Sequence, residues 1–213
     1  MKARFIVFEG IDASGKTNIS KMLAEHLQAK LFSFPNYATP TGKLIREYLQ
    51  KKWWTIELHQ ESPKHPPVTQ LSQERDALIF QTLQAANRLE LIQEIQDYLE
   101  DGHIVICDRY IVSGEVYGAA DGLFPAYLER LFAFLPQPDI TFLLDIPVEE
   151  SFRRRPDRNG DRYEEDKAKL EDIRQRYLKL FQRRAYDNPW KWQIIDGTQS
   201  PQEILKKILD IVQ

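Results

Sequence analysis

The sequence has a single cysteine and no long apolar run. Cys107 alone cannot form an internal disulfide or a zinc site built from several cysteines, and it fits a reducing compartment. No apolar run approaches the roughly 18 residues that a membrane helix needs, so we expect no membrane partner. Residues 1–8 lack the pattern of a secretory signal, and we therefore expect a cytoplasmic protein.

An excess of one charge is also lacking, because 29 basic and 32 acidic residues give a formal net charge of −3. This balance excludes a surface that is basic throughout, and we expect no nucleic-acid partner. Hydrophobic residues make up 42% of the chain, as in ordinary globular proteins. The length of 213 residues is near the upper end for one domain, so residues 1–213 are predicted to form a single domain.

Short apolar runs alternate with stretches of helical periodicity along the whole chain. The runs have the composition of strands buried on both faces of a parallel sheet, and they lie at 5–8, 31–34, 104–107, 140–144 and 192–195. Helices are predicted after the first run, around 44–49, and over 69–100, 124–134, 148–155, 164–186 and 201–212. The order predicts an α/β fold of three layers, a five-stranded parallel sheet with helices on both faces. Residues 51–68 contain three prolines and are predicted to be an irregular insertion.

The segment after the first strand is Gly10-Ile11-Asp12-Ala13-Ser14-Gly15-Lys16-Thr17, which fits the P-loop pattern G-x-x-x-x-G-K-[ST]. It lies between a predicted strand and a predicted helix, as that motif requires. Its glycines allow backbone N–H groups to curl round a phosphate, and the helix N-terminus adds a partial positive charge. Lys16 is expected to reach the β- and γ-phosphates, and the Thr17 hydroxyl to bind Mg²⁺. The segment therefore predicts a nucleotide site.

Two further groups of charged residues fit such a site. Asp108 and Arg109 directly follow the third strand, where side chains point into the ligand crevice of an open parallel sheet. Asp108 is expected to hold the magnesium through water, and Arg109 to bind a phosphate.

Farther along, five arginines fall within ten positions: Arg153, Arg154, Arg155, Arg158 and Arg162. They predict an arginine-rich lid over residues 153–163 that closes over the transferring phosphoryl group. A solvated helix end or a nucleic-acid patch is the alternative interpretation.

In combination these motifs resemble the thymidylate kinases, a family of P-loop nucleoside monophosphate kinases. The segments that carry the resemblance keep the family's order: 8–12 with the P-loop, 33–35 with 42–45, 86–88, 108–110 with 113–114, and 162–164. A P-loop alone is shared by many functions, whereas this ordered combination is specific. The resemblance implies Mg²⁺-dependent phosphoryl transfer from ATP to dTMP, giving dTDP and ADP, by a homodimer.

The resemblance also implies roles for single residues. ATP would lie on the P-loop, with Arg155 stacked on the adenine. Asp12 would hold the sugar 3′-hydroxyl and Tyr163 would lie under the deoxyribose. Arg88 would bond the base edge, although from the helical pattern alone an arginine there belongs on the surface. Arg109 would contact the acceptor phosphate, and the other acceptor-binding residues would be Phe34, Pro35, Gln84, Ser113 and Tyr117. Lys16, Asp108 and Arg109 would serve catalysis. Ala13 stands where some members carry an arginine, so Arg154 or Arg158 of the lid would supply that charge.

The sequence departs from the family on the acceptor side only. Gln84 stands where members usually have a phenylalanine that stacks on thymine, and Gly118 where they often have glutamine or threonine near the base. Asn36 and Tyr37 occupy the place of a usual arginine, and the insertion 51–68 looks longer than the family's connection. We therefore expect phosphoryl transfer to be retained and the base preference to be altered, toward a larger or modified base.

Other functions stay open at this point. One is a kinase for another nucleoside monophosphate or for a nucleoside. A GTP-binding switch is disfavoured because no Asn-Lys-x-Asp element occurs in the sequence. A nucleic-acid-dependent ATPase is disfavoured by the net acidity, the small size and the lack of aromatic residues between the lid arginines.

Overall fold

A computed structural model of the chain describes residues 4–50, 70–155, 163 and 166–212. In these residues the strands form one sheet in the order β2-β3-β1-β4-β5, and every pairing is parallel. The strands are β1 Phe5–Glu9, β2 Lys30–Ser33, β3 Val105–Asp108, β4 Ile140–Asp145 and β5 Trp192–Asp196. The predicted five-stranded parallel sheet is confirmed, because each strand lies within one residue of its predicted bounds.

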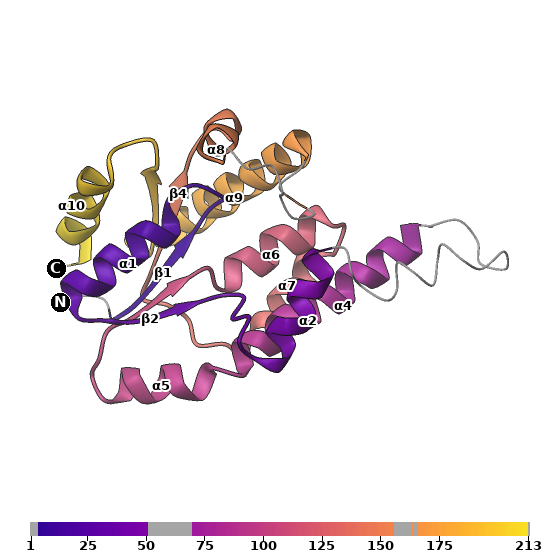
Figure 1. Cartoon of the computed structure of the whole chain (residues 1–213), viewed down its shortest axis with the longest axis horizontal. Helices are drawn as coiled ribbons and strands as arrows, with labels where there is room; N and C mark the ends of the chain where they lie inside the picture. The colour runs from indigo at the N-terminus through magenta and orange to yellow at the C-terminus, as the bar shows by residue number, and fades with distance from the viewer. Residues whose placement is uncertain (1–3, 51–69, 156–162, 164–165, 213) are drawn as a thin grey trace, which may run out of the picture.

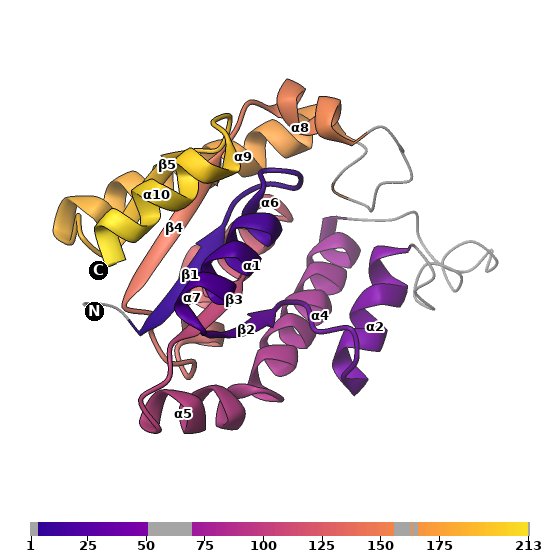
Figure 2. The same ribbon diagram turned by 60° about the vertical axis from the view of Figure 1, so that its left-hand side comes forward.

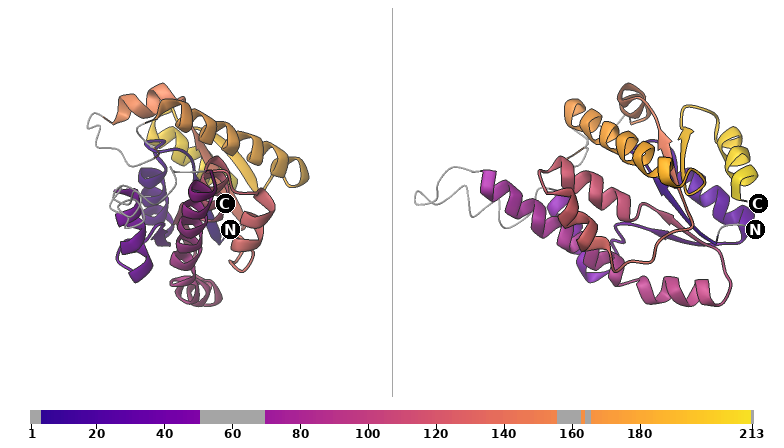
Figure 3. Two further views of the ribbon diagram at one scale, coloured as in Figure 1. Left: turned by 90° about the vertical axis from the view of Figure 1, so that its right-hand side faces the viewer. Right: turned by 180° about the vertical axis from the view of Figure 1, so that it is seen from behind.

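Helices cover both faces of this sheet (Figure 1). They are α1 Lys16–Leu27, α2 Pro40–Leu49, α4 Gln70–Leu89, α5 Ile92–Glu100, α6 Ile111–Ala120, α7 Pro125–Phe132, α8 Val148–Arg154, α9 Lys167–Asp187 and α10 Pro201–Val212. Helices α1 and α10 lie on one face, while α6, α7 and α9 lie on the other with the end of α4. The α2 and α4 helices run side by side at one end of the molecule (Figure 2). The long helix α9 packs along α6 and against β4 and β5 (Figure 3).

The core has two apolar layers because successive residues of a strand point to opposite faces. Ile6 and Phe8 of β1 pack with residues of α1 and α10, including Ile19 and Ile208. Their neighbours Phe5 and Val7 pack on the other side, with residues of α5 and α7 such as Ile95 and Leu128. No helix among the described residues is long and apolar enough to cross a membrane.

The prediction of one helix over residues 69–100 was wrong, because the chain leaves the helix between α4 and α5. There the Leu91 N–H donates to the Arg88 carbonyl three residues back, at 3.1 Å. The Glu90 carboxylate accepts hydrogen bonds from the Thr41 N–H and hydroxyl. Apolar residues keep a helical spacing across the break, so the pattern could not reveal it.

Helix α6 was not predicted at all. Most of its residues are buried, so it has no polar face that would produce an amphipathic pattern. It also contains two glycines, which are weak helix formers. At Gly114 the close packing requires glycine, because a Cβ there would come within 2.2 Å of the Phe132 ring.

The carboxyl ends of the five strands share one edge of the sheet, and the chain segments that follow them form the site. The P-loop follows β1, Phe34 follows β2, Arg109 follows β3, and Gly197 follows β5. The sequence motifs are therefore gathered at the edge where parallel α/β sheets bind ligands. The insertion 51–68 and lid residues 156–162 lie outside the described residues.

Candidate active site

The P-loop has the backbone of an anion-binding loop. Gly10, Ala13 and Gly15 all have positive φ, at 142°, 59° and 96°. A Cβ at Gly10 would lie 2.6 Å from the Leu144 carbonyl oxygen, so glycine is required there. Gly15 is the N-cap of α1, and no side chain caps that helix end. Its first N–H groups therefore face the loop, where they and the helix dipole favour a phosphate.

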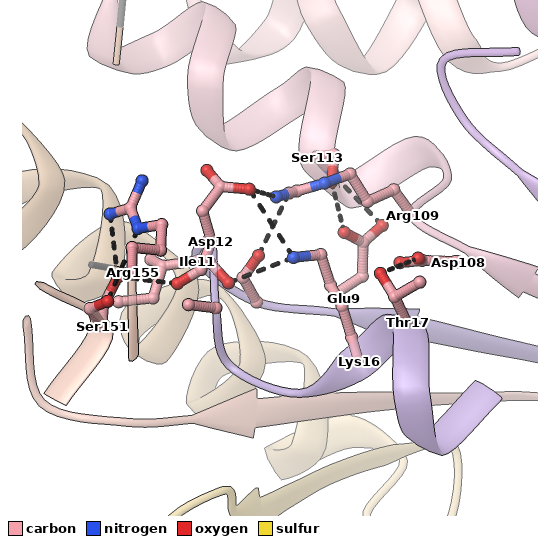
Figure 4. Close-up of polar contacts among 12 residues, drawn as sticks. Glu9, Ile11, Asp12, Lys16, Thr17, Asp108, Arg109, Ser113, Ser151 and Arg155 are labelled. Carbon is pink, nitrogen blue, oxygen red and sulfur yellow. Dashed lines mark hydrogen bonds and ion pairs between the residues drawn. The ribbon is translucent and has the colours of Figure 1, made fainter. Parts of the chain in front are cut away.

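Lys16 points back across this loop (Figure 4). Its ammonium donates to the Ile11 carbonyl at 3.1 Å and lies 3.8 Å from an Asp12 carboxylate oxygen. Burial lowers the pKa of Lys16, and the Arg109 charge adds to this effect, while Asp12 opposes it. The charge of Lys16 is thus held in a site without a full counter-charge, which suits an incoming anion.

Thr17 and Asp108 meet beside the loop, as the sequence predicts. The Thr17 hydroxyl donates to Asp108 Oδ2 at 2.5 Å. The other carboxylate oxygen, Oδ1, is buried and has no hydrogen-bond partner in the part of the chain that the structure describes. A buried carboxylate oxygen without a donor is costly unless a ligand or a cation completes it.

Arg109 binds Asp12 in the centre of the site (Figure 4). Its guanidinium donates to Asp12 Oδ1 at 2.5 Å, to the Gly10 carbonyl at 3.1 Å and to the Ser113 hydroxyl at 3.3 Å. Arg109 itself has a φ of 63°, a conformation rare outside glycine and found mostly where a surrounding network enforces it. Burial alone would raise the pKa of Asp12, but Arg109 and Lys16 hold it at about 2. Asp12 therefore stays a carboxylate at neutral pH.

Glu9 supports the chain segment that follows Arg109, and the sequence predicted no role for it. Its carboxylate is fully buried and accepts from the Tyr110 and Ser113 N–H groups and from the Ser113 hydroxyl. The Tyr177 hydroxyl also donates to it, at 3.3 Å. Glu9 thereby fixes the start of α6, which directly follows Arg109. A charged residue at the end of an otherwise apolar strand was the signal available in the sequence.

Beyond Asp12 and Arg109 lies a cleft lined by both polar and aromatic side chains. It contains all nine of the predicted acceptor-binding residues, together with five residues that were not predicted to bind the acceptor. The predicted ones are Asp12, Phe34, Pro35, Gln84, Arg88, Arg109, Ser113, Tyr117 and Tyr163, and the five are Tyr37, Leu49, Phe80, Gln81 and Gly114. Gln81 could have been found, because it lies three and seven residues before Gln84 and Arg88 on the same helix face.

Arg88 is buried, with 1% of its surface exposed, so the surface position favoured by the helical pattern was wrong. Its guanidinium donates to the Tyr110 carbonyl through Nε and Nη2, at 3.0 and 2.8 Å. Nη1 donates to the carbonyl and to the side-chain oxygen of Gln84. Burial lowers the pKa of Arg88 to about 10, so it still carries its charge at neutral pH. These backbone partners make the burial of the charge possible.

Two tyrosines, Tyr117 of α6 and Tyr163, lie side by side in the lining of this cleft. The rings of Tyr117 and Tyr163 meet edge to face with centroids 4.9 Å apart. The Tyr117 hydroxyl donates to Asp12 at 3.2 Å. The Tyr163 hydroxyl donates to Asp121, whose carboxylate also binds Lys169. Both rings are thus held in place without a ligand.

The described part of the lid begins with arginines at the end of α8. Arg154 donates to the carbonyls of Ala13 and Gly197, and it lines a second cleft together with Lys16 and Thr17. Arg155 donates to Ser151 and lies over the Phe152 ring. Arg158 and Arg162 lie outside the described residues.

We call the cleft that Tyr117 and Tyr163 line the acceptor cleft, and the second cleft, lined by Lys16 and Thr17, the P-loop cleft. Asp12 of the acceptor cleft contacts Lys16 of the P-loop cleft as well as Arg109. A parallel α/β sheet with a P-loop beside a second, partly apolar cleft defines a nucleotide-dependent phosphotransferase. Comparison with known proteins shows which enzymes this chain resembles.

The sequence matches the family "Thymidylate kinase" over residues 8–62 and 68–208. A probable thymidylate kinase of Pyrococcus abyssi is 35% identical over 221 residues, which cover 100% of this chain and 97% of that protein. The thymidylate kinase of Schizosaccharomyces pombe is 28% identical over 99% of this chain and 92% of its own. The solved thymidylate kinase of Candida albicans superimposes with a TM-score of 0.76 at 29% identity, over 99% of this chain and 91% of that one.

The chain belongs to the thymidylate kinase family. It is a dTMP kinase, which phosphorylates dTMP to dTDP with ATP as the phosphoryl donor. The predicted family, fold and reaction are thereby confirmed, and the GTP-switch and nucleic-acid-dependent alternatives are set aside.

Proposed function

We propose that ATP binds in the P-loop cleft, that dTMP binds in the adjoining cleft, and that Lys16 and Arg109 act on the phosphates from the two sides. The observation that carries this assignment is the contact of Asp12 with both cations. Because one carboxylate touches both, the γ-phosphate of ATP and the 5′-phosphate of dTMP would be brought together at this point.

The chemistry needs no strong general base, because the acceptor phosphate is already ionised. Catalysis is then positioning together with neutralisation of charge. Lys16 would exchange its hydrogen bond to the Ile11 carbonyl for a phosphate oxygen. Arg109 would hold the acceptor phosphate while Asp12 and Gly10 keep its guanidinium in place.

Thr17 and Asp108 are the residues that we propose to hold Mg²⁺, Asp108 through water. They fit this ion because both offer oxygen atoms and because Asp108 Oδ1 is buried without a partner. A site with few protein ligands is usual for Mg²⁺, since phosphates and waters complete its shell. When bound with ATP, Mg²⁺ would neutralise charge on the β- and γ-phosphates.

Of the two lid arginines considered for catalysis, we propose Arg154. It lies against the carbonyls of the P-loop and beside Lys16 in the same cleft. Charge on the transferring phosphoryl group would draw its guanidinium from those carbonyls to the phosphate oxygens.

The remaining roles rest on the family resemblance and on where the side chains lie. We propose that Asp12 also bonds the sugar 3′-hydroxyl, that Tyr163 lies under the deoxyribose and that Arg155 stacks on adenine. The single domain, the homodimer, the cytoplasmic location and an altered base preference stay predictions.

The proposal is tested by ADP release in a coupled assay with ATP, Mg²⁺ and a panel of nucleoside monophosphates. Lys16→Ala should lower the dTMP-dependent turnover by about 10³-fold or more, because it removes a charge that acts on the transferring group. Lys21→Ala is the matched control, since Lys21 lies exposed on the same helix and should leave turnover unchanged. Wild-type turnover in Lys16→Ala would contradict the site assignment.

A further inference from the structure

Gln81, on α4, is a buried side chain with no hydrogen bond among the described residues. Only 1% of its surface is exposed, and neither Nε2 nor Oε1 has a partner. Burying an amide group without a hydrogen-bond partner is costly, so native proteins seldom keep one without a reason. Gln81 also lines the acceptor cleft. An unpaired amide that lines a substrate cleft indicates that its hydrogen-bond partner belongs to the substrate.

Gln84, the glutamine that the sequence analysis singled out, differs from Gln81 in this respect. Its side-chain oxygen already accepts from Arg88 at 2.9 Å, and its backbone carbonyl accepts from the same guanidinium. Gln84 therefore orients Arg88. Gln81, one turn earlier on the same helix, has both its donor and its acceptor available.

The packing around Gly118 explains why Gln81 can occupy this place. A Cβ at position 118 would lie 3.1 Å from Gln81 Cγ and 2.6 Å from a Leu128 methyl carbon. Gln81 and Leu128 thus fill the space that a side chain at position 118 would occupy.

We propose that Gln81 reads the base of the acceptor nucleotide, which rests on dTMP being that acceptor. The thymine ring presents an N3–H donor between two carbonyl acceptors. Gln81 Oε1 would accept from N3–H, and Nε2 would donate to the neighbouring carbonyl oxygen. One amide thus satisfies a donor and an acceptor of thymine at once, and the base satisfies both orphaned atoms of Gln81. Gln81 is accordingly a specificity-determining residue.

The test uses Gln81→Met, which keeps the length of the side chain and removes both polar atoms. We expect kcat/KM for dTMP to fall about 10- to 100-fold, because a site built to bond a polar edge loses most when that bond is removed. The midpoint of thermal unfolding without ligand should stay the same or rise, since an unpaired buried amide has been removed. A purely structural role of Gln81 would instead lower that midpoint.

Two controls keep the result specific. Thr82→Val changes the next residue of α4, which is exposed and bonds only within its own helix, and it should leave kcat/KM unchanged. The ligand 2-deoxyribose 5-phosphate has the sugar and phosphate of dTMP without the base, so its inhibition constant should be the same for wild type and Gln81→Met.

The outcomes separate this proposal from the activity on which it rests. If the wild-type protein shows no dTMP-dependent ADP release, the active-site assignment fails. If the wild type is active and Gln81→Met matches it within two-fold on dTMP, the role of Gln81 is overturned. An equal loss of affinity for dTMP and for 2-deoxyribose 5-phosphate would also overturn it, because the change would then not concern the base. Gln81→Leu also removes both polar atoms, and it provides the same comparison should Gln81→Met fold poorly.

Discussion

Asp12 shows at the scale of a single residue how the neighbours set the chemistry of the site. Its carboxylate touches both Lys16 and Arg109, and these charges outweigh the effect of burial on its pKa. Asp12 thus holds the charged ends of Lys16 and Arg109 apart and oriented. On the proposed assignment, phosphate oxygens would replace part of the contacts that these two cations make. An uncharged residue at position 12 would leave the two cations facing each other without a counter-charge.

This gives a prediction for stability against pH. The folded pKa of Asp12, about 2, lies below the ordinary value of 3.8, so its contribution to the free energy of unfolding is complete above about pH 4 to 5 and is lost as the pH falls toward 2. At pH 6, Asp12→Asn should be less stable than wild type by about 2 kcal/mol. That difference should shrink by about 1 kcal/mol at pH 3, as measured by urea unfolding at both pH values. A difference that does not change with pH would contradict the ion pair.

The sequence predicted single residues well where their chemistry is tied to a motif, and less well where burial decides. Thr17, Asp108 and Arg109 come together as expected, because they follow strands whose ends share an edge. Arg88 was placed on the surface by its pattern, since nothing in a sequence shows that the Tyr110 and Gln84 carbonyls will be there to receive a buried guanidinium. The absence of a partner for Gln81 is likewise a property of packing.

At the scale of elements, α4 joins the acceptor cleft to the segment after β2. Asn87 is fully buried near the end of α4. Its side-chain oxygen accepts from the Asn36 N–H at 2.8 Å, and its amide donates to the Asn36 carbonyl and to the Thr39 and Thr41 hydroxyls. Through these bonds one side chain holds the loop that follows Phe34 and Pro35, which line the cleft.

We therefore expect Asn87→Ala to lower the free energy of unfolding by about 2–3 kcal/mol, because several buried partners lose their hydrogen bonds. The KM for dTMP should rise at the same time, since the loop is no longer tied to α4, while the KM for ATP should change little. Gln93→Ala is the control: Gln93 is an exposed amide on α5 that bonds only Asp97. Equal effects on both KM values would show that Asn87 acts on the fold as a whole and not on the acceptor loop.

The strands were the most predictable elements, because strands buried on both faces read as continuous apolar runs. Helices were predicted less well, for two different reasons: one helix was missed, and one break in a helix was missed. Helix α6 is buried nearly all round and so has no amphipathic pattern. The break between α4 and α5 lies where Glu90 accepts hydrogen bonds from Thr41, a residue about fifty positions earlier, while the apolar spacing continues across it.

At the scale of the whole molecule, one sheet edge brings together residues from distant parts of the sequence. Arg109, after β3, binds Asp12 of the P-loop, and Arg154, at the end of α8, binds the Ala13 carbonyl of the same loop. On the proposed assignment the two nucleotides would meet here while each keeps its own cleft. We therefore expect phosphoryl transfer to dTMP to be fast relative to transfer to water.

The most direct measurement follows the label from γ-³²P-ATP with dTMP present and with dTMP omitted. With dTMP, the label should appear in dTDP; without it, release of inorganic phosphate should be slower by about 10²-fold or more, because no acceptor phosphate occupies the place beside Arg109. Label released as inorganic phosphate at the same rate under both conditions would contradict the account.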